Sequence, residues 1–319
     1  WRSRVTEFDD DPVASASIGQ VHRATWSDGR AVAVKIQYPG ADDALRADLK
    51  TLSRFVGLLG TLAPGTDVRA VLDEMSARTE EELDYRIEGE NQRAFAATYD
   101  GDPRFAVPRV VASAPKAVVS EWMDGTALSK IVASGTAEQR NTAGENLARF
   151  HFESAARVRR LHGDPHPGNF KLLDDGRLGV IDFGACLSLP NGLPPELGRM
   201  VRLSRDEEFD ELNALMRDTG FVLPGHTVTD QEIADYLRPF TDPIKTDSFH
   251  FTRKWMQDTA GRAADFNGPQ FRTARSLNLP PQYAVIFRVL LGSVGICAQL
   301  DASAPYMAIL TEWMPGFAD

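Results

Sequence analysis

The sequence has 319 residues, of which 43% are hydrophobic and 25% are charged, and its formal net charge is −10. A chain of this length can bury a large core and is expected to form two lobes or two domains. The negative charge and the lack of Lys/Arg tracts argue against a nucleic-acid-binding protein. Its two cysteines, Cys186 and Cys297, are far apart, which argues against a zinc site or a disulfide framework and favours a reducing compartment.

No uninterrupted apolar run reaches the ~18–20 residues of a membrane span. The longest, residues 283–300, is interrupted by Arg288 and Gln299. The first residue is Trp rather than Met, and no signal-peptide pattern follows it. We therefore expect a cytoplasmic protein without a transmembrane segment in this chain, and a sequence that begins inside a longer one.

Residues 13–26 predict a strand, a loop of small residues and a second strand, and the turn at residues 27–30 leads into a third strand at residues 31–37. Alternation in the third strand places Val32, Val34 and Ile36 on one face. Lys35 then lies on the opposite face, which the small-residue loop is expected to cover. The V-A-V-K context favours a phosphate-binding lysine over a solvated one.

The small-residue loop is unusual for a phosphate-binding loop. Glycines usually allow backbone N–H groups to approach phosphate oxygens closely, but here Gly19 is the only glycine. The predicted nucleotide-binding positions in this loop are Ala14, Ser15, Ala16, Ser17, Ile18, Gly19 and Gln20. Since a Cβ restricts the backbone at most of them, we expect a stiffer and more selective loop.

Helical periodicity covers residues 42–60 and 68–99. The second of these helices is rich in acidic residues, which usually form a solvated face. Glu88, however, lies where a helix would supply the carboxylate that pairs with Lys35. Glu82 and Asp84 precede it by nearly two turns, and they either block access to the site, position a metal or remain solvated.

Residues 105–111 and 117–121 predict two further strands. Residues 121–125 then leave the sheet before a helix that begins near Leu128. In a two-lobed nucleotide enzyme such a connector binds the adenine edge, so Glu121 and Met123 are candidate nucleotide contacts, although Met123 could equally be a packing residue.

The strongest motif in the chain is the run of residues 161–170, L-H-G-D-P-H-P-G-N-F, followed by D-F-G at residues 182–184. It comes after a helix predicted at residues 138–161. An Asp, an Asn five residues later and a D-F-G triplet are typical of metal-assisted phosphoryl transfer. Asp164 would orient or deprotonate the attacking hydroxyl, and Asn169 and Asp182 would hold Mg²⁺. Two short strands joined by an Asp-Gly turn would place Asn169 and Asp182 on one rim.

The rest of the chain predicts helices at residues 196–205, 207–219, 230–240, 251–262 and 281–300. We therefore predict an α+β fold with two lobes. Residues 1–124 would form a small β-rich lobe with inserted helices, and residues 125–319 would form a mostly helical lobe that carries the catalytic and metal-binding loops.

With these residues assembled, the chain resembles the UbiB family of atypical protein-kinase-like proteins, also called aarF-domain or ADCK kinases. The resemblance covers about residues 10–300. It rests on the motifs at residues 14–22, 34–40, 82–85, 162–169 and 182–184.

The resemblance implies a protein-kinase-like fold, ATP and Mg²⁺ as cofactors, and ATPase or restrained kinase activity. It implies that Lys35 contacts the α- and β-phosphates and pairs with Glu88, that Asp164 is the catalytic base, and that Glu82 and Asp84 form a regulatory E-x-D motif. It also implies a role in isoprenoid-quinone or other lipid metabolism, a lipid or quinone-precursor ligand, and peripheral contact with the inner face of a membrane. The family's K-x-G-Q motif is not found, and it would precede residue 1.

Two alternatives stay open. The chain could be a pseudokinase that binds nucleotide without turnover, or a small-molecule phosphotransferase of the aminoglycoside or choline kinase type. Protein substrates are disfavoured, because Pro194-Pro195-Glu196 follows Gly184 too closely to leave a docking platform.

Overall fold

The computed structural model describes residues 2–54, 76, 79, 82–264 and 277–318. The chain divides into two compact units. The first contains residues 1–97, 107–124 and 182–185, and the second contains residues 98–106, 125–181 and 186–319. The chain passes between the units after Asp124. It also does so around residues 98–106 and around the D-F-G segment, which packs in the first unit.

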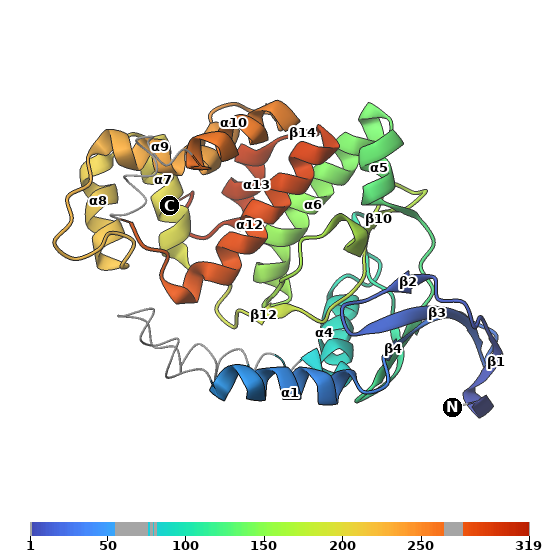
Figure 1. The fold of residues 1–319 in the computed structure, drawn as a ribbon. Helices are drawn as coiled ribbons and strands as arrows, with labels where there is room; N and C mark the ends of the chain where they lie inside the picture. The colour runs from blue at the N-terminus through green and yellow to red at the C-terminus, as the bar shows by residue number, and fades with distance from the viewer. Residues whose placement is uncertain (1, 55–75, 77–78, 80–81, 265–276, 319) are drawn as a thin grey trace. The chain divides into compact units, whose positions relative to one another are not determined.

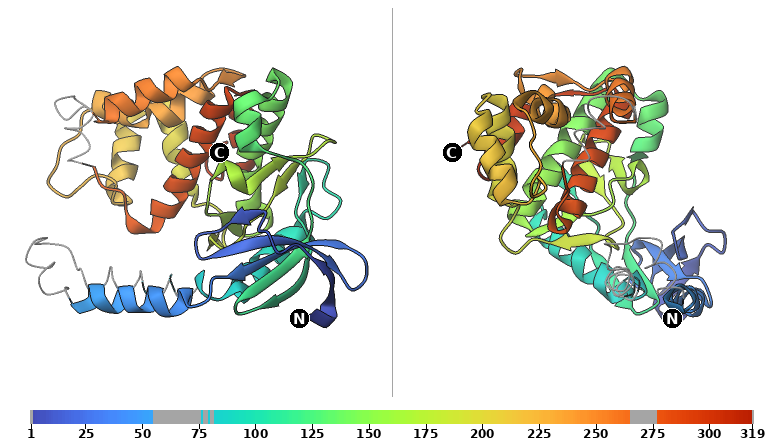
Figure 2. Two further views of the ribbon diagram at one scale, coloured as in Figure 1. Left: turned by 45° about the vertical axis from the view of Figure 1, so that its right-hand side comes forward. Right: turned by 60° about the vertical axis from the view of Figure 1, so that its left-hand side comes forward.

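The first unit is built on an antiparallel sheet with the strand order β1-β3-β4-β7-β6, in which β2 also pairs with β3 (Figure 2). Its strands are β1 (Val5–Phe8), β2 (Ala14–Ser15), β3 (Gly19–Trp26), β4 (Ala31–Gln37), β6 (Val110–Ala114) and β7 (Ala117–Glu121), after a short 3-10 helix at Arg2–Arg4. The alternation predicted for β4 is present: Val32 and Val34 are buried with Val119 in an apolar cluster, and Ile36 packs against it. Lys35 lies on the other face of the strand.

Two helices of the first unit are described, α1 (Ala41–Arg54) and α4 (Tyr85–Thr98). The prediction of one continuous helix over residues 68–99 was wrong in its described part. Residues 83–84 are not helical, because the Asp84 Oδ1 accepts a hydrogen bond of 3.0 Å from the Arg86 N–H and caps a new helix that begins at Tyr85. The remainder of that prediction, and the predicted end of α1 at residue 60, lie outside the described residues.

The strand predicted over residues 105–111 was also wrong, because two strands occupy this stretch. They are β5 (Phe105–Ala106), which belongs to the second unit, and β6, which belongs to the first. Pro108 lies between them and has no N–H to donate to a ladder. Its carbonyl accepts a hydrogen bond of 2.7 Å from the Gln92 side chain of α4 instead.

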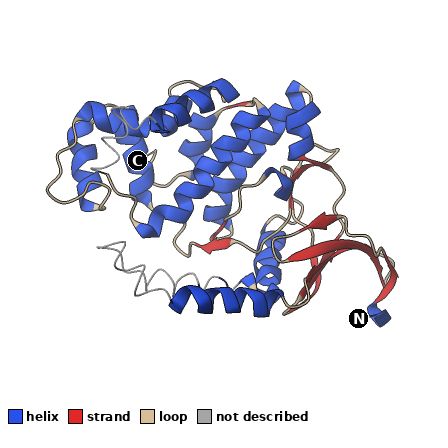
Figure 3. Ribbon diagram, viewed as in Figure 1, coloured by secondary structure: helices blue, strands red, loops and turns tan. Residues whose placement is uncertain are grey.

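The second unit is mostly helical (Figures 1 and 3). Its described helices are α5 (Leu128–Ser134), α6 (Ala137–Arg157), α7 (Pro195–Arg205), α8 (Phe209–Asp218), α9 (Asp230–Thr241), α10 (Arg253–Ala264), α12 (Pro281–Leu300) and α13 (Tyr306–Trp313). The long helices α6 and α12 pack against each other. The helix predicted to run to Leu161 ends at Arg157, because Arg159 adopts a left-handed φ of 57° and residues 160–162 form strand β9.

The second unit contains short strands, of which β9 and β10 flank the loop that carries the strongest motif. They are β8 (Thr126–Ala127), β9 (Arg160–His162), β10 (Phe170–Leu172), β11 (Leu178–Val180), β12 (Cys186–Ser188), β13 (Phe249–His250) and β14 (Ser303–Ala304). The predicted hairpin is formed by β10 and β11, in which Phe170 pairs with Val180, and Gly176 supplies the positive φ that its turn requires. The sequence analysis did not predict β9, β12, β13, β14 or α13.

Helix α12 alone among the described helices is long and apolar enough to cross a membrane by length and composition, with a mean hydropathy of 1.7. A core helix can meet the same criterion, and 44% of this segment is buried within the structure. Arg288, whose charge argued against a membrane span, donates a hydrogen bond of 2.8 Å to the carbonyl of Gly163.

Candidate functional site: an ion-paired lysine and an Asp-Asn loop

Lys35 is held between two carboxylates of the first unit. Its Nζ lies 2.9 and 3.0 Å from the two side-chain oxygens of Glu88 and 3.1 Å from Oδ2 of Asp182. These residues come from β4, from α4 and from the D-F-G segment, which are distant in the sequence. The pairing of Lys35 with Glu88 that the family resemblance implied is therefore present in the structure.

Burial and charge act against each other at this ion pair. The Glu88 side chain is only 5% exposed and that of Lys35 13%. Burial of the ammonium lowers the pKa of Lys35, but the Glu88 carboxylate and then Asp182 outweigh it, so the pKa is raised overall and the amine stays charged. Burial raises the pKa of Glu88, and the Lys35 charge opposes that rise. A charged lysine is thus kept at a fixed position by a buried partner.

One face of α4 holds the D-F-G segment. Its positions 88, 91 and 95 follow the helical repeat, so they share a face. Asn91 Nδ2 donates to the Phe183 carbonyl at 3.3 Å, and the Phe95 ring lies 4.9 Å from the Phe183 ring, which is fully buried. Asn91 and Phe95 were missed by the sequence analysis; their spacing from Glu88 is the signal that could have found them.

Asp182 has a left-handed backbone, with a φ of 63°. Its Oδ1 accepts a hydrogen bond of 3.3 Å from the Gly184 N–H, a local turn that Asp tolerates better than most residues. A non-glycine residue in this region costs free energy and persists where the surroundings hold it. Here the Lys35 ammonium and the docked Phe183 hold it, so the carboxylate has a defined direction.

The small-residue loop closes tightly without a left-handed residue. Ser15 pairs with Gln20 across the β2–β3 hairpin, and the Ala16 N–H donates to the Gly19 carbonyl at 2.8 Å. The positive φ values in the described chain do not include any residue from 13 to 20. Gly19 is needed for space instead, because a Cβ there would lie 2.2 Å from the Ile36 carbonyl oxygen. The stiffness and selectivity of this loop remain predictions.

The E-x-D residues lie on either side of a buried leucine. Leu83 is 6% exposed, and its carbonyl accepts a hydrogen bond of 2.7 Å from the Gln37 side chain of β4. Glu82 is exposed, and Asp84 caps α4 and pairs with Arg86. The Arg86 hydrogen bonds lower the pKa of Asp84, so this carboxylate stays ionised. Its metal-binding or blocking role remains a prediction.

The predicted connector leaves the end of β7. The Glu121 carboxylate pairs with Arg30 at 2.9 Å, and the Trp122 N–H donates to the Ala31 carbonyl. Met123 is half-buried. These contacts fix the connector against β4, and the nucleotide contacts of Glu121 and Met123 remain predictions.

In the second unit, Asp164 and Asn169 are joined directly. Asn169 Nδ2 donates to Asp164 Oδ2 at 2.8 Å and to the Asp164 carbonyl at 3.2 Å. The Asn169 amide nitrogen donates both of these hydrogen bonds, so the Asn169 Oδ1 is the atom that can accept from, or coordinate, other partners. His166 stabilises the loop, because its Nδ1 accepts from the Gly168 N–H and its carbonyl accepts from the Asn169 N–H. The Asp164 side chain stays exposed.

Helix α12 supports this loop from behind. Arg288 donates to the Gly163 carbonyl, and a Cβ on Gly292 would lie 2.3 Å from Cγ of Pro165, so the helix backbone approaches the loop closely. Next to it, His162 is fully buried, with the rings of Phe150 and Phe170 at 6.2 and 5.4 Å. The sequence analysis missed Arg288 and Gly292, since more than 100 residues separate them from the motif.

The oxygens of Asn169 and Asp182 suit a hard divalent cation. A carboxylate and an amide oxygen are ligands that Mg²⁺ takes together with water and phosphate oxygens, so two protein ligands are enough. No group of three or more His, Cys, Asp or Glu residues able to hold a metal is found in the described part of the chain. Each of the two side chains therefore offers an oxygen that Mg²⁺ accepts as a ligand.

Residues 1–204 match the ABC1 atypical kinase-like domain. This chain belongs to that family. The match confirms the resemblance to the UbiB family and the kinase-like α+β fold. The chain is therefore an atypical kinase-like protein.

Several named proteins are similar to this ABC1 atypical kinase-like chain. It is 28% identical over 346 residues to Arabidopsis thaliana Protein ACTIVITY OF BC1 COMPLEX KINASE 1, chloroplastic, covering 98% of this chain and 47% of that protein. It is 32% identical over 190 residues to Saccharomyces cerevisiae Atypical kinase COQ8, mitochondrial, covering 58% and 37%. The chain spans about half the length of the first curated relatives it matches.

A solved structure is more similar. The complex of Rv3197 with erythromycin from Mycobacterium tuberculosis has 52% sequence identity and a TM-score of 0.90, and the match covers 100% of this chain and 80% of that one. The fold described above is therefore shared with an experimentally determined member of the same structural type.

Proposed function

We propose that this chain binds Mg²⁺-ATP and acts as an atypical kinase or ATPase of the UbiB type. The single observation that supports this most is the pairing of Lys35 with Glu88 and Asp182, within 3.1 Å of the lysine Nζ. A buried lysine that stays charged on a strand beside a small-residue loop is suited to binding phosphate oxygens.

Each residue has a separate role in this proposal. Lys35 contacts the α- and β-phosphates, and Glu88 holds the lysine in position. Asn169 and Asp182 are the ligands for Mg²⁺, which neutralises charge on the phosphates when bound. Within the second unit, the Ile181 N–H donates to the Asn169 carbonyl at 2.9 Å, and Asp182 is the next residue in the chain.

Asp164 acts on the acceptor. Its carboxylate is exposed, and the Asn169 amide fixes its direction. It orients a hydroxyl or a water molecule and takes up its proton as the phosphoryl group is transferred. The small-residue loop, whose backbone is restricted by side chains at Ala14–Ser17, limits the approach of the nucleotide and favours restrained turnover.

The experiment that tests the proposal measures phosphate release from Mg²⁺-ATP by the parent chain, Asp164→Asn and Asp182→Asn, together with nucleotide affinity by calorimetry. Asp182→Asn should weaken Mg²⁺-ATP binding at least tenfold, because a full ligand charge disappears. Asp164→Asn should bind normally and lose turnover. Unchanged affinity in Asp182→Asn would contradict the metal assignment.

We propose a lipid or a quinone-precursor-like phenol as the acceptor or effector, with contact at a membrane surface. This follows from the family and from the short segment between Gly184 and α7, which begins at Pro195. Phosphate release should therefore be compared with and without lipid vesicles and such phenols. A pseudokinase would bind nucleotide and release no phosphate in any of these mixtures, and a small-molecule phosphotransferase would respond to soluble hydroxyl acceptors alone.

A second candidate function is macrolide binding. The solved structure that is 52% identical over the whole chain is a complex with erythromycin, which favours this candidate. Calorimetric titration of this chain with erythromycin, with and without Mg²⁺-ATP, tests it. The absence of binding heat in both titrations, with a competing displacement assay also negative, would reject it.

A further inference from the structure

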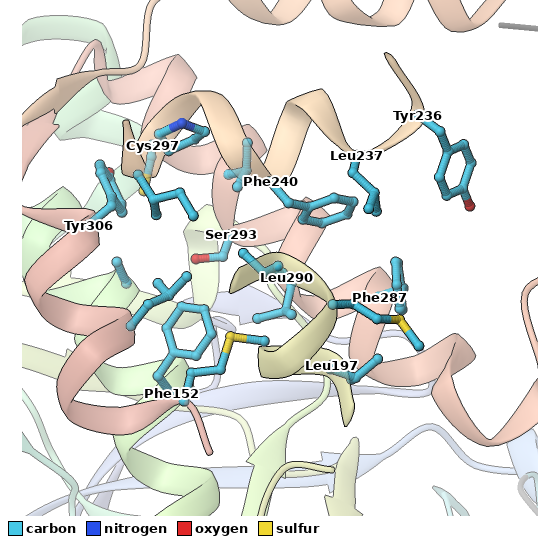
Figure 4. A pocket seen from close by; sticks show the side chains of 18 of the residues that line it. Phe152, Leu197, Tyr236, Leu237, Phe240, Phe287, Leu290, Ser293, Cys297 and Tyr306 are labelled. Atoms are coloured by element: carbon cyan, nitrogen blue, oxygen red, sulfur yellow. The ribbon is translucent and has the colours of Figure 1, made fainter. Parts of the chain in front are cut away.

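An apolar cavity lies inside the second unit, and its lining includes none of the residues assigned to nucleotide. It has a volume of about 90 Å³ and is lined by side chains from α6, α7, α9, α12 and α13. Figure 4 shows Leu237 and Phe240 on one side of it and Phe287 and Leu290 on the other. The described lining residues include none with a charged side chain.

The few polar side-chain groups of the lining are uncharged or already hydrogen-bonded. The Ser293 Oγ lies 3.2 Å from Nδ1 of the buried His151. Burial raises the pKa of the Cys297 thiol to about 11 and that of Tyr306 well above its usual value, so neither carries charge near neutral pH. The hydroxyls of Tyr236, Ser293 and Tyr306 and the Cys297 thiol lie among an otherwise apolar lining. An apolar cavity of about 150 Å³ in another protein binds benzene.

The cavity has an accessible rim. Phe240 on α9 and Phe287, Leu290 and Val294 on α12 are only half-buried although all of them line it. The Phe240 and Phe287 rings contact each other with centroids 5.5 Å apart, so a ligand that enters between α9 and α12 must displace one of these two side chains. The small volume admits one end of a chain and is far too small for a macrolide.

The same helix that lines the cavity also supports the loop that carries Asp164. On α12, Leu290 and Ser293 face the cavity. Neighbouring residues of the same helix contact the loop: Arg288 donates a hydrogen bond to the Gly163 carbonyl, and the Gly292 backbone lies close to Pro165. Interiors are close-packed, so a small displacement of α12 by an occupant reaches the loop directly.

We propose that this cavity binds the end of an uncharged hydrocarbon chain, linear or prenyl, and that α12 transmits its occupancy to the loop of residues 163–169. The site is separate from the nucleotide-binding residues, and its test needs no nucleotide.

The test uses two neighbouring residues of α12. Leu290→Trp fills the cavity, whereas Leu291→Trp is the matched control, because Leu291 is 45% exposed and does not line the cavity. Binding of 1-decanol and of farnesol is measured by thermal unfolding and by calorimetry for the whole chain. The parent and Leu291→Trp should bind one of the two chains with equal affinity and unfold at a higher temperature. Leu290→Trp should bind at least tenfold more weakly.

If Leu290→Trp fails to fold, Val294→Leu adds a smaller group to the same lining and should weaken binding several-fold. The stronger response identifies a linear or a prenyl chain. Hydrogen exchange at the amides of His166, Gly168 and Asn169 should change several-fold on binding in the parent and remain unchanged in the filled variant. Equal binding to both tryptophan variants, no binding to the parent, or binding with unchanged exchange at these amides would each overturn the proposal.

Discussion

The buried charges of Lys35 and Glu88 stabilise the first unit only as a pair. Taking either charge alone out of water is costly, and removing one partner of a buried pair leaves the other uncompensated. Glu88 is 4% exposed as a residue and receives two hydrogen bonds from the lysine. The Lys35–Glu88 pair therefore contributes to stability and also carries the proposed phosphate contact. Substituting one residue or both separates these two effects.

We predict that Lys35→Met lowers the free energy of unfolding by about 3 kcal/mol or more and abolishes phosphate release. The double variant with Glu88→Gln should recover much of the stability without recovering activity. Lys116→Met is the control, because Lys116 pairs with Asp42 at 2.7 Å on the surface, where such pairs contribute about 1 kcal/mol or less. Urea unfolding measures all three. Parent-like stability of Lys35→Met would show that Glu88 does not need its partner.

Asp84 combines a structural and a predicted regulatory role, and these can also be separated. Because its side chain caps α4 through the Arg86 N–H, Asp84→Ala should lower the free energy of unfolding by about 1 kcal/mol. Asn is an equally good cap, so Asp84→Asn should keep the stability while removing the charge. If the E-x-D motif regulates the site, phosphate release changes in both variants. A change in Asp84→Ala alone would mean that only the cap matters.

At the level of the elements, α12 has two glycines with opposite expected behaviour. A Cβ on Gly295 meets nothing within 4 Å, whereas one on Gly292 meets Pro165 at 2.3 Å. We predict that Gly295→Ala raises the free energy of unfolding by about 0.5–1 kcal/mol, the usual gain in a helix interior. Gly292→Ala should lower it and reduce phosphate release by displacing the loop of Asp164. A stabilising Gly292→Ala with full activity would contradict the close approach of α12 to this loop.

The elements also show what local patterns can and cannot predict. The alternation around Lys35 and the Asp-Gly turn between β10 and β11 depend on neighbouring residues, so both were predicted from the sequence. The break in the helix before Tyr85 was not predicted. The acidic residues around Asp84 follow a helical pattern, and only the contact of its side chain with the backbone shows that Asp84 caps a new helix. The docking of Phe183 on Asn91 and Phe95 joins residues about 90 positions apart, and no local pattern specifies that contact.

For the whole molecule, the buried His151 is expected to make stability depend on pH. Burial, with the neighbouring His162, lowers its pKa from 6.5 to about 3. Between these values the unfolded chain binds a proton that the folded chain does not. The histidine's contribution is therefore complete above pH 6.5 and is lost as the pH falls toward 3.

The expected loss is at most about 1.4 kcal/mol per pH unit in that window. His151→Gln should reduce this slope. Urea unfolding of the parent and of His151→Gln at several pH values from neutral to acidic measures both slopes. An identical slope in parent and His151→Gln would contradict a neutral buried ring.

The membership of the two units was the part of the fold least accessible from the sequence. The sequence analysis divided the chain into residues 1–124 and residues 125–319. Strand β5 and the D-F-G segment, however, each pack in the unit to which their neighbours in the chain do not belong. When lobes are predicted from the order of elements along the chain, each segment is assigned to the same lobe as its neighbours in the sequence. A segment that packs in the other unit is therefore missed.

These two exchanged segments restrict how the gene can be dissected. A fragment that stops at Asp124 would retain Lys35 and Glu88 but lose residues 182–185, and would carry a short strand whose partner, β11, is on the missing piece. The complementary fragment would lack that strand and keep an Asp-Phe-Gly with no helix to receive it. Swaps between relatives should therefore exchange β5 and residues 182–185 along with the segments they pack against, or replace the whole chain.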